Sequence, residues 1–141
     1  MFRSFLKPRH ILAATAVLAA GTLLAAPLCW AAGDDVRTVA TETLPNVPGK
    51  SITAIVVSYA PGAKSMKHHH AGSVLAYVLS GEIRSENSAT GPAKVYKAGE
   101  TFFEPPGSEH LVSENASATE PASLLAIFIA DDGAELTVYD E

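Results

Sequence analysis

The sequence predicts an all-β protein built as a single sandwich or barrel. From residue 36 onward it shows no helical stripe, and short runs rich in Val, Ile, Tyr, Phe and Thr alternate with turn residues. The clearest runs are Ser51–Tyr59, Val74–Ser80, Thr101–Glu104 and Ser123–Ala130. Many short strands at this spacing are typical of all-β sandwiches and barrels. The sequence contains no internal repeat, so one barrel is expected.

The first 32 residues have the pattern of a secretory signal peptide. Residues 1–10 carry three basic side chains and no acid, and residues 11–26 are all apolar or small. We therefore expect a mature chain that begins near residue 32 and lies in the periplasm or outside the cell. The alternative is an uncleaved N-terminal anchor, because residues 11–32 are just long enough to cross a bilayer. Only in that case would the protein be attached to a membrane.

The remaining chain divides into a short arm and one domain. Residues 33–50 are polar and contain Pro45 and Pro48, which predicts an extended arm that leads into the first core strand. Residues 51–141 are expected to form the barrel. Cys29 is the only cysteine and belongs to the N-terminal segment, so the barrel is expected to be stable without an intramolecular disulfide.

The charge of the mature chain excludes one class of partner. Removal of residues 1–32 takes three of the ten basic residues and none of the fifteen acidic ones, so seven face fifteen and the net charge is −8. A protein of this charge repels phosphate backbones, and nucleic acid is therefore excluded as a main partner. The expected partner is a small-molecule ligand or substrate.

Three histidines have the spacing of metal ligands. His68 and His70 are two residues apart, so on a strand they share one face while His69 between them points the other way. His110 follows a Pro-Pro-Gly turn in a separate strand. Three imidazoles that converge from two strands make a good site for a first-row divalent metal ion. His69 is expected to be exposed and to take no part.

The segments around these histidines resemble the two sequence motifs of the cupin superfamily. The residues in register with the motifs are Gly62, His68, His70, Gly81, Gly99, Pro105, Gly107 and His110. The resemblance covers residues 51–130. It implies a small single-domain cupin of type 2, that is, one jelly-roll barrel (a double-stranded β-helix) behind the signal segment, with a metal site formed by the three histidines.

Two positions depart from the cupin pattern. Val74 stands where the first motif usually has a glutamate ligand, and Glu114 stands where an asparagine usually follows the second. The missing glutamate points to the three-histidine subset of cupins, which includes several iron dioxygenases. Fe2+ is therefore the favoured cofactor, and the same donors also suit Mn2+, Ni2+, Cu2+ and Zn2+. Three neutral ligands leave the full charge on the ion, and open positions remain for an anionic bidentate oxygen ligand.

These features predict an exported oxidoreductase of the Fe(II) dioxygenase type that acts on a small oxygen-rich or enolisable substrate. Two alternatives remain open from the sequence. One is a non-catalytic cupin that only binds a small molecule. The other is a metal-assisted isomerase or decarboxylase, which would need the metal but not oxygen.

Glu104 is a further candidate for the site. It lies six residues before His110, at a position that is usually apolar and faces the barrel interior in cupins. A buried carboxylate is costly unless it is paired or lies near a cation. We therefore expect it to hold a histidine ligand or a metal-bound water by a hydrogen bond, or to act as a general base. The alternative is a twisted strand that leaves Glu104 in solvent at the barrel mouth.

The alternation of side chains along Val74–Ser80 also predicts an outer apolar face that could form an interface between two copies of the protein. If even positions of Val74–Ser80 point inward, then Leu75, Tyr77 and Leu79 form an apolar outer face. Because cupins commonly pair through their outer sheets, a homodimer is expected. A separate expectation concerns the larger apolar side chains near the motifs, which are predicted to fill the barrel or the contacts between sheets. These are Met66, Phe102, Phe103 and Phe128.

Overall fold

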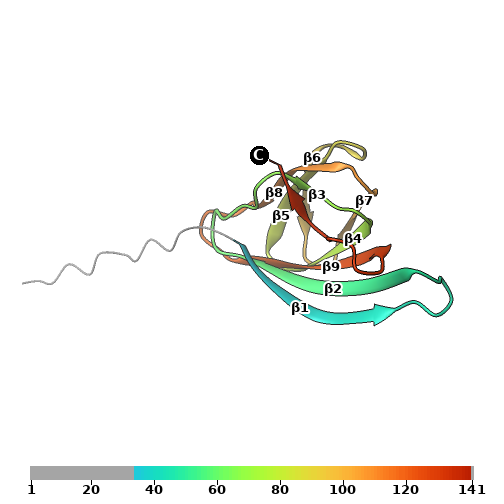
Figure 1. The fold of residues 1–141 in the computed structure, drawn as a ribbon. Helices are drawn as coiled ribbons and strands as arrows, with labels where there is room; N and C mark the ends of the chain where they lie inside the picture. Colours follow the sequence, from blue (N-terminus) through green and yellow to red (C-terminus); the bar gives the residue numbers. More distant parts are fainter. Residues whose placement is uncertain (1–33, 141) are drawn as a thin grey trace, which may run out of the picture.

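The computed structural model describes residues 34–140, which form ten β-strands and contain no helix (Figure 1). Within this range no segment is a helix long and apolar enough to cross a membrane. The predicted signal peptide or anchor at residues 1–32, together with Cys29, lies outside the described residues. The strands are β1 (Asp34–Thr43), β2 (Lys50–Tyr59), β3 (His68–His69), β4 (Ser73–Ser80), β5 (Glu82–Asn87), β6 (Gly91–Lys97), β7 (Thr101–Glu104), β8 (Glu109–Asn115), β9 (Ala122–Asp131) and β10 (Val138–Tyr139).

The strands form two five-stranded antiparallel sheets. One has the order β1-β2-β9-β4-β7 and the other the order β10-β3-β8-β5-β6. Figure 1 shows the two sheets facing each other, with the β1–β2 hairpin extending past the second sheet. The predicted all-β class is confirmed, and the four strands expected from the sequence correspond to β2, β4, β7 and β9.

The alternation of side chains along β4 follows the predicted phase. Even positions such as Val74 and Val78 are fully buried, and odd positions such as Leu75 and Tyr77 are more than two-fifths exposed. The neighbouring strand β9 turns its own even positions inward, where they form the hydrophobic core with β4 and β7. Its buried residues are Ala122, Leu124, Ala126, Phe128 and Ala130.

Four apolar side chains were predicted to be buried in the barrel or between the sheets, and the prediction is right for two of them and wrong for the other two. Phe102 and Phe128 are buried, whereas Met66 and Phe103 are 66% and 47% exposed. Phe103 follows Phe102 on β7, so the period of two turns it to the outer face of the sheet. Met66 lies in the loop before β3, where strand alternation does not apply.

The segment predicted as an arm, residues 33–50, contains a strand of the first sheet. Residues 34–43 form β1, which pairs with β2 along its length apart from a bulge between Thr38 and Ala40. The pairing satisfies backbone groups of β2 that would otherwise lie at a free edge. Nearly every side chain of β1 is exposed, so the sequence carries no alternation that would mark it as a core strand.

A glycine fixes how closely the histidine-bearing segment approaches the first sheet. Gly72 lies between β3 and β4, and a Cβ atom on it would stand 2.2 Å from the carbonyl oxygen of Ile129 on β9. The same atom would stand 2.7 Å from the Cβ of Ala130. Only glycine therefore allows the chain to pass from His70 into β4 at this distance.

We predict that Gly72→Ala lowers the free energy of unfolding by about 3 kcal/mol or more, because the backbone of one strand must move. The matched control is Gly62→Ala, where φ is +69° and nothing lies near the new Cβ. That change should cost only about 1–2 kcal/mol for the left-handed backbone. Urea unfolding of both metal-free variants measures the difference, and equal losses would contradict the close approach described here.

Candidate metal centre

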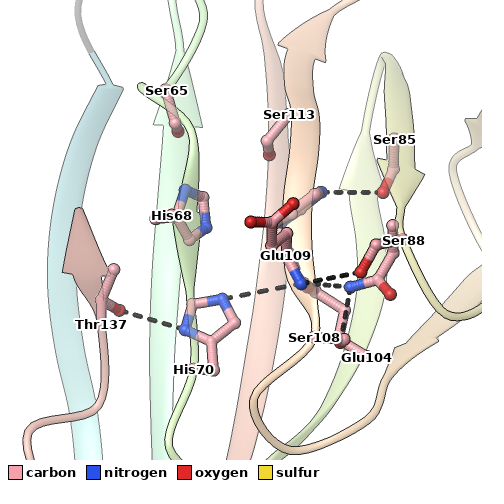
Figure 2. Close-up of polar contacts among 12 residues, drawn as sticks. Ser65, His68, His70, Ser85, Ser88, Glu104, Ser108, Glu109, Ser113 and Thr137 are labelled. Carbon is pink, nitrogen blue, oxygen red and sulfur yellow. Dashed lines mark hydrogen bonds and ion pairs between the residues drawn. The ribbon is translucent and has the colours of Figure 1, made fainter. Parts of the chain in front are cut away.

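Three histidine side chains meet inside the barrel from two neighbouring strands. His68 lies on β3 and pairs directly with His110 on β8, and His70 follows one residue after β3 ends. All three are buried, and one nitrogen from each lies within 4.8 Å of the others. In Figure 2, His68 and His70 project from the same segment toward the middle of the barrel. The three residues selected from the sequence are therefore brought together at metal-binding distance.

Backbone carbonyls fix the protonation of the first two imidazoles. Nδ1 of His68 lies 2.7 Å from the carbonyl oxygen of Met66, and Nδ1 of His70 lies 2.9 Å from that of Leu136. A carbonyl oxygen can only accept, so Nδ1 carries the hydrogen in both rings and Nε2 keeps its lone pair. Burial also lowers the pKa of both histidines. Both rings are thus neutral near pH 7 and present a free nitrogen, as metal binding requires.

His110 contributes a buried nitrogen that lacks a hydrogen-bond partner. Its Nε2 lies 2.9 Å from the hydroxyl of Ser85, a contact drawn in Figure 2. Its Nδ1 lies 3.0 Å from Oε2 of Glu104, but the two are not aligned for a hydrogen bond. An unsatisfied buried nitrogen next to a carboxylate oxygen is costly unless a cation or a proton lies with them. The donor set therefore fits a metal ion.

Glu104 lies inside the barrel rather than in solvent at its mouth. Its side chain is 4% exposed, and Oε2 lies 3.8 Å from Nε2 of His70 and 3.4 Å from Nδ2 of Asn87. Burial, the largest single effect, raises the pKa of this carboxyl, but the contact with His110 and the attraction of the histidine rings when they are protonated together outweigh burial. The net result is a pKa below its usual value. The carboxylate is therefore negative at neutral pH and faces the imidazoles.

Glu104 lies directly opposite Val74, the residue that stands in place of the glutamate of the first motif. Val74 on β4 and Glu104 on β7 are direct partners in the antiparallel pair, and both side chains are buried. Such partners share a face of the sheet, with Cβ atoms about 4.5–5.5 Å apart. The centre thus has a carboxylate close to the place where the motif usually puts a glutamate, and the carboxylate comes from the neighbouring strand.

A small cavity adjoins the three histidines. Its volume is about 80 Å³, and the exposed residues Val36 and Tyr139 mark its mouth. Apolar side chains such as Phe102 and Phe128 form much of its wall. A closed apolar cavity of about 150 Å³ holds benzene, so this one suits a ligand of only a few heavy atoms beside the metal.

Sequence reasoning missed several polar residues around the centre. Ser85 and Asn87 lie on β5 in phase with the buried Ile83, and both are buried. The signal was available, because polar residues at alternate inward positions of a strand are unusual. His69, by contrast, is 38% exposed and lies 3.4 Å from Oδ1 of Asp140, away from the three-histidine centre.

Fold and site together define a barrel with a buried three-histidine centre between two antiparallel sheets. The chain belongs to the cupin family, because the family model described as a cupin domain matches residues 55–128, more than half of the chain. No curated protein matches the sequence significantly.

Solved structures show the same fold at low sequence identity. Oxalate oxidase in complex with the substrate analogue glycolate has a TM-score of 0.60 at 22% identity, over 79% of this chain and 57% of that one. A double-stranded β-helix protein from Klebsiella pneumoniae has a TM-score of 0.59 at 21% identity, over 77% and 86%. The DMSP lyase DddQ from Ruegeria pomeroyi has a TM-score of 0.54 at 22% identity, over 62% and 42%. The chain thus spans less than half the length of this lyase.

We predict that the three central histidines hold the metal and that His69 does not. His68→Ala, His70→Ala and His110→Ala should each weaken metal affinity by more than about 100-fold, since loss of even a residue behind the ligands costs about 10–100-fold. His69→Ala is the matched control and should bind normally. Titration with Zn2+ followed by calorimetry measures the affinities, and equal losses at His69 and His70 would contradict the assignment.

We predict that the charge of Glu104 helps to hold the metal. Glu104→Gln keeps the shape of the side chain, removes its charge and should weaken Zn2+ binding by about 10–100-fold. The exposed Glu109→Gln is the control. Because Val74 and Glu104 face each other, the double variant Val74→Glu/Glu104→Val should recover much of the affinity. Normal binding by Glu104→Gln would show that the carboxylate takes no part in holding the ion.

Proposed function

We propose that this cupin is an exported metal-dependent oxidoreductase that uses oxygen to oxidise a small oxygen-rich or enolisable substrate. Fe2+ is the favoured metal. The protein would act in the periplasm or outside the cell. The observation that carries the proposal is the set of three buried histidines, with an ionised carboxylate beside them and a small cavity that adjoins them. A divalent ion held by neutral imidazoles would keep its charge, polarise a bound oxygen ligand and supply one-electron chemistry if it is iron.

The residues of the chain provide orientation, exclusion of water and a base. The carbonyls of Met66 and Leu136 hold the rings of His68 and His70 in one orientation. The apolar walls of the cavity limit the water around a bound substrate. Glu104 is ionised and buried, so its oxygen can accept a hydrogen bond from an enol or hydroxyl group that binds next to the histidines, and it can take the proton where a bound metal lowers the pKa of that group. Proton removal prepares such a substrate for oxidation.

One observation favours a second candidate, a metal-assisted isomerase, decarboxylase or lyase. A base at Glu104 needs no oxygen to remove a proton from a metal-bound substrate. The structurally similar proteins include both an oxidase and a lyase, so the fold is compatible with either class. A cupin that only binds its ligand would use the same histidines without turnover.

An oxygen-uptake assay tests the proposal. We expect the protein purified from its exported fraction and reconstituted with Fe2+ without air to consume oxygen with at least one class among diketones, phenols and thiols. His70→Ala should abolish the uptake. Product formed without oxygen would establish the isomerase or decarboxylase instead. Binding without any product would establish a binding protein.

We further propose that the protein is a homodimer. Exposed apolar side chains gather on the outer face of the first sheet, where Leu75 pairs directly with Phe103 across β4 and β7. The other exposed apolar residues on these strands and on β9 are Tyr77, Leu79 and Ile129. An apolar face of this kind is typical of a protein interface.

Light scattering at micromolar concentration is expected to give the mass of a dimer. Tyr77→Arg should shift the protein to a monomer, because it places a charge in the proposed interface. Val95→Arg, on β6 of the second sheet, is the control and should leave the dimer intact. A monomeric wild-type mass would contradict the proposal.

A further inference from the structure

A chain of hydroxyl groups forms one wall of the cavity. The hydroxyl of Tyr59 lies 2.8 Å from Oγ of Ser65 and 2.8 Å from Oγ of Ser113, and Oγ of Ser65 lies 2.5 Å from Oδ2 of Asp34. All four residues line the cavity. Figure 2 shows Ser65 and Ser113 beyond His68, on the side away from His70. The chain of hydroxyl groups therefore lies at the opposite end of the three-histidine centre from His70.

The number of hydrogens fixes the direction of every hydrogen bond in this chain. The carboxylate of Asp34 accepts from Ser65, which uses the only hydroxyl hydrogen of Ser65. Tyr59 must then donate to Ser65, and Ser113 must donate to Tyr59. Burial raises the pKa of Tyr59, so its hydroxyl keeps its hydrogen at neutral pH. The wall has no hydroxyl hydrogen left to donate and offers only lone pairs.

The charges around the cavity also favour a ligand that donates hydrogen bonds over one that carries a carboxylate. The cavity lining, as far as the structure describes it, contains two carboxylates, Asp34 and Glu104, and neither lysine nor arginine. The lining has two further hydroxyls: that of Thr137 lies 3.3 Å from Nδ1 of His70, and Tyr139 packs edge-on against His68, where burial and the nearby charge of Asp34 raise its pKa. A ligand carboxylate against the hydroxyl chain would meet the lone pairs of Ser113 and the negative charge of Asp34, which is costly in a part-buried place. A hydroxyl or ammonium group would find acceptors.

The geometry points to a substrate with a hydrogen-bond donor, a hydroxyl or an ammonium group, at the end that lies away from the metal. The chelating end binds at the three histidines, and the donor binds Ser113 and Asp34. Substrates with a carboxylate at that end are disfavoured. The inference rests on the proposed function, because it requires a metal that binds a small chelating ligand.

A series of four hydroxamates tests this inference, since all have the same metal-binding group and differ only in the tail. The probes are propionohydroxamate with a methyl tail, 3-hydroxypropionohydroxamate, β-alanine hydroxamate with an ammonium tail, and succinate monohydroxamate with a carboxylate tail. Calorimetry on the Zn2+-loaded protein, with metal-free protein as the blank, gives the affinities. We expect the hydroxyl and ammonium probes to bind at least about ten-fold more tightly than the carboxylate probe.

Three variants locate the effect in the wall. Asp34→Asn should reduce the preference for the ammonium tail by about five-fold or more, and Asp35→Asn, next to it but exposed, should leave the preference unchanged. In Tyr59→Phe, the hydroxyl hydrogen of Ser113 no longer has Tyr59 as its acceptor. The affinity of this variant for the carboxylate probe should therefore rise. Metal content and thermal unfolding of each variant establish that the centre is intact.

The outcomes separate this inference from the proposed function. Binding that requires the metal but shows no preference among the tails would overturn the inference alone. The same holds if the carboxylate probe binds best, or if Asp34→Asn behaves like Asp35→Asn. If no hydroxamate binds the Zn2+-loaded protein better than the metal-free protein, the proposed function and the inference both fail.

Discussion

The structure depends on one constraint, which is that polar atoms buried between the two sheets must find partners there. The barrel buries three imidazoles and a carboxylate, and it meets most of their needs with carbonyls and hydroxyls from nearby strands. The remaining mismatch is the contact between Nδ1 of His110 and Oε2 of Glu104. A cation is the partner that suits both atoms, so the same requirement that shapes the interior also defines its chemistry.

The fold could be read from the sequence where one face of a strand is buried and the other is not. The period of two in Val74–Ser80 predicts both the strand and its inward side chains, and the structure agrees. The same reasoning fails for β1, because an edge strand that buries no side-chain face leaves no periodic trace. Its place is set by backbone hydrogen bonds to β2, which depend on no particular side chain.

The site was predictable as far as residue type and spacing define it. His68 and His70 are two apart on one segment, so their shared face follows from strand geometry alone. The surroundings of Glu104 were not predictable, because they depend on the register between β4 and β7, and no local pattern encodes that register. The hydroxyl chain likewise joins residues from three parts of the sequence, because Asp34 and Ser113 lie far from the neighbouring pair Tyr59 and Ser65. Ser65 and Ser113 look like ordinary strand and loop residues until the fold brings Tyr59 between them.

The position of β1 at the edge of its sheet has a dynamic consequence. This strand has a single partner and almost no buried side chains, so local opening should cost less free energy here than at an interior strand. Asp34 and Val36 are on β1, whereas His68 and His110 are on strands with a neighbour on each side. Opening at the mouth of the cavity should therefore cost less free energy than a displacement of these two histidines. Rapid amide exchange in β1 and slow exchange in β8 would be the signature of that division.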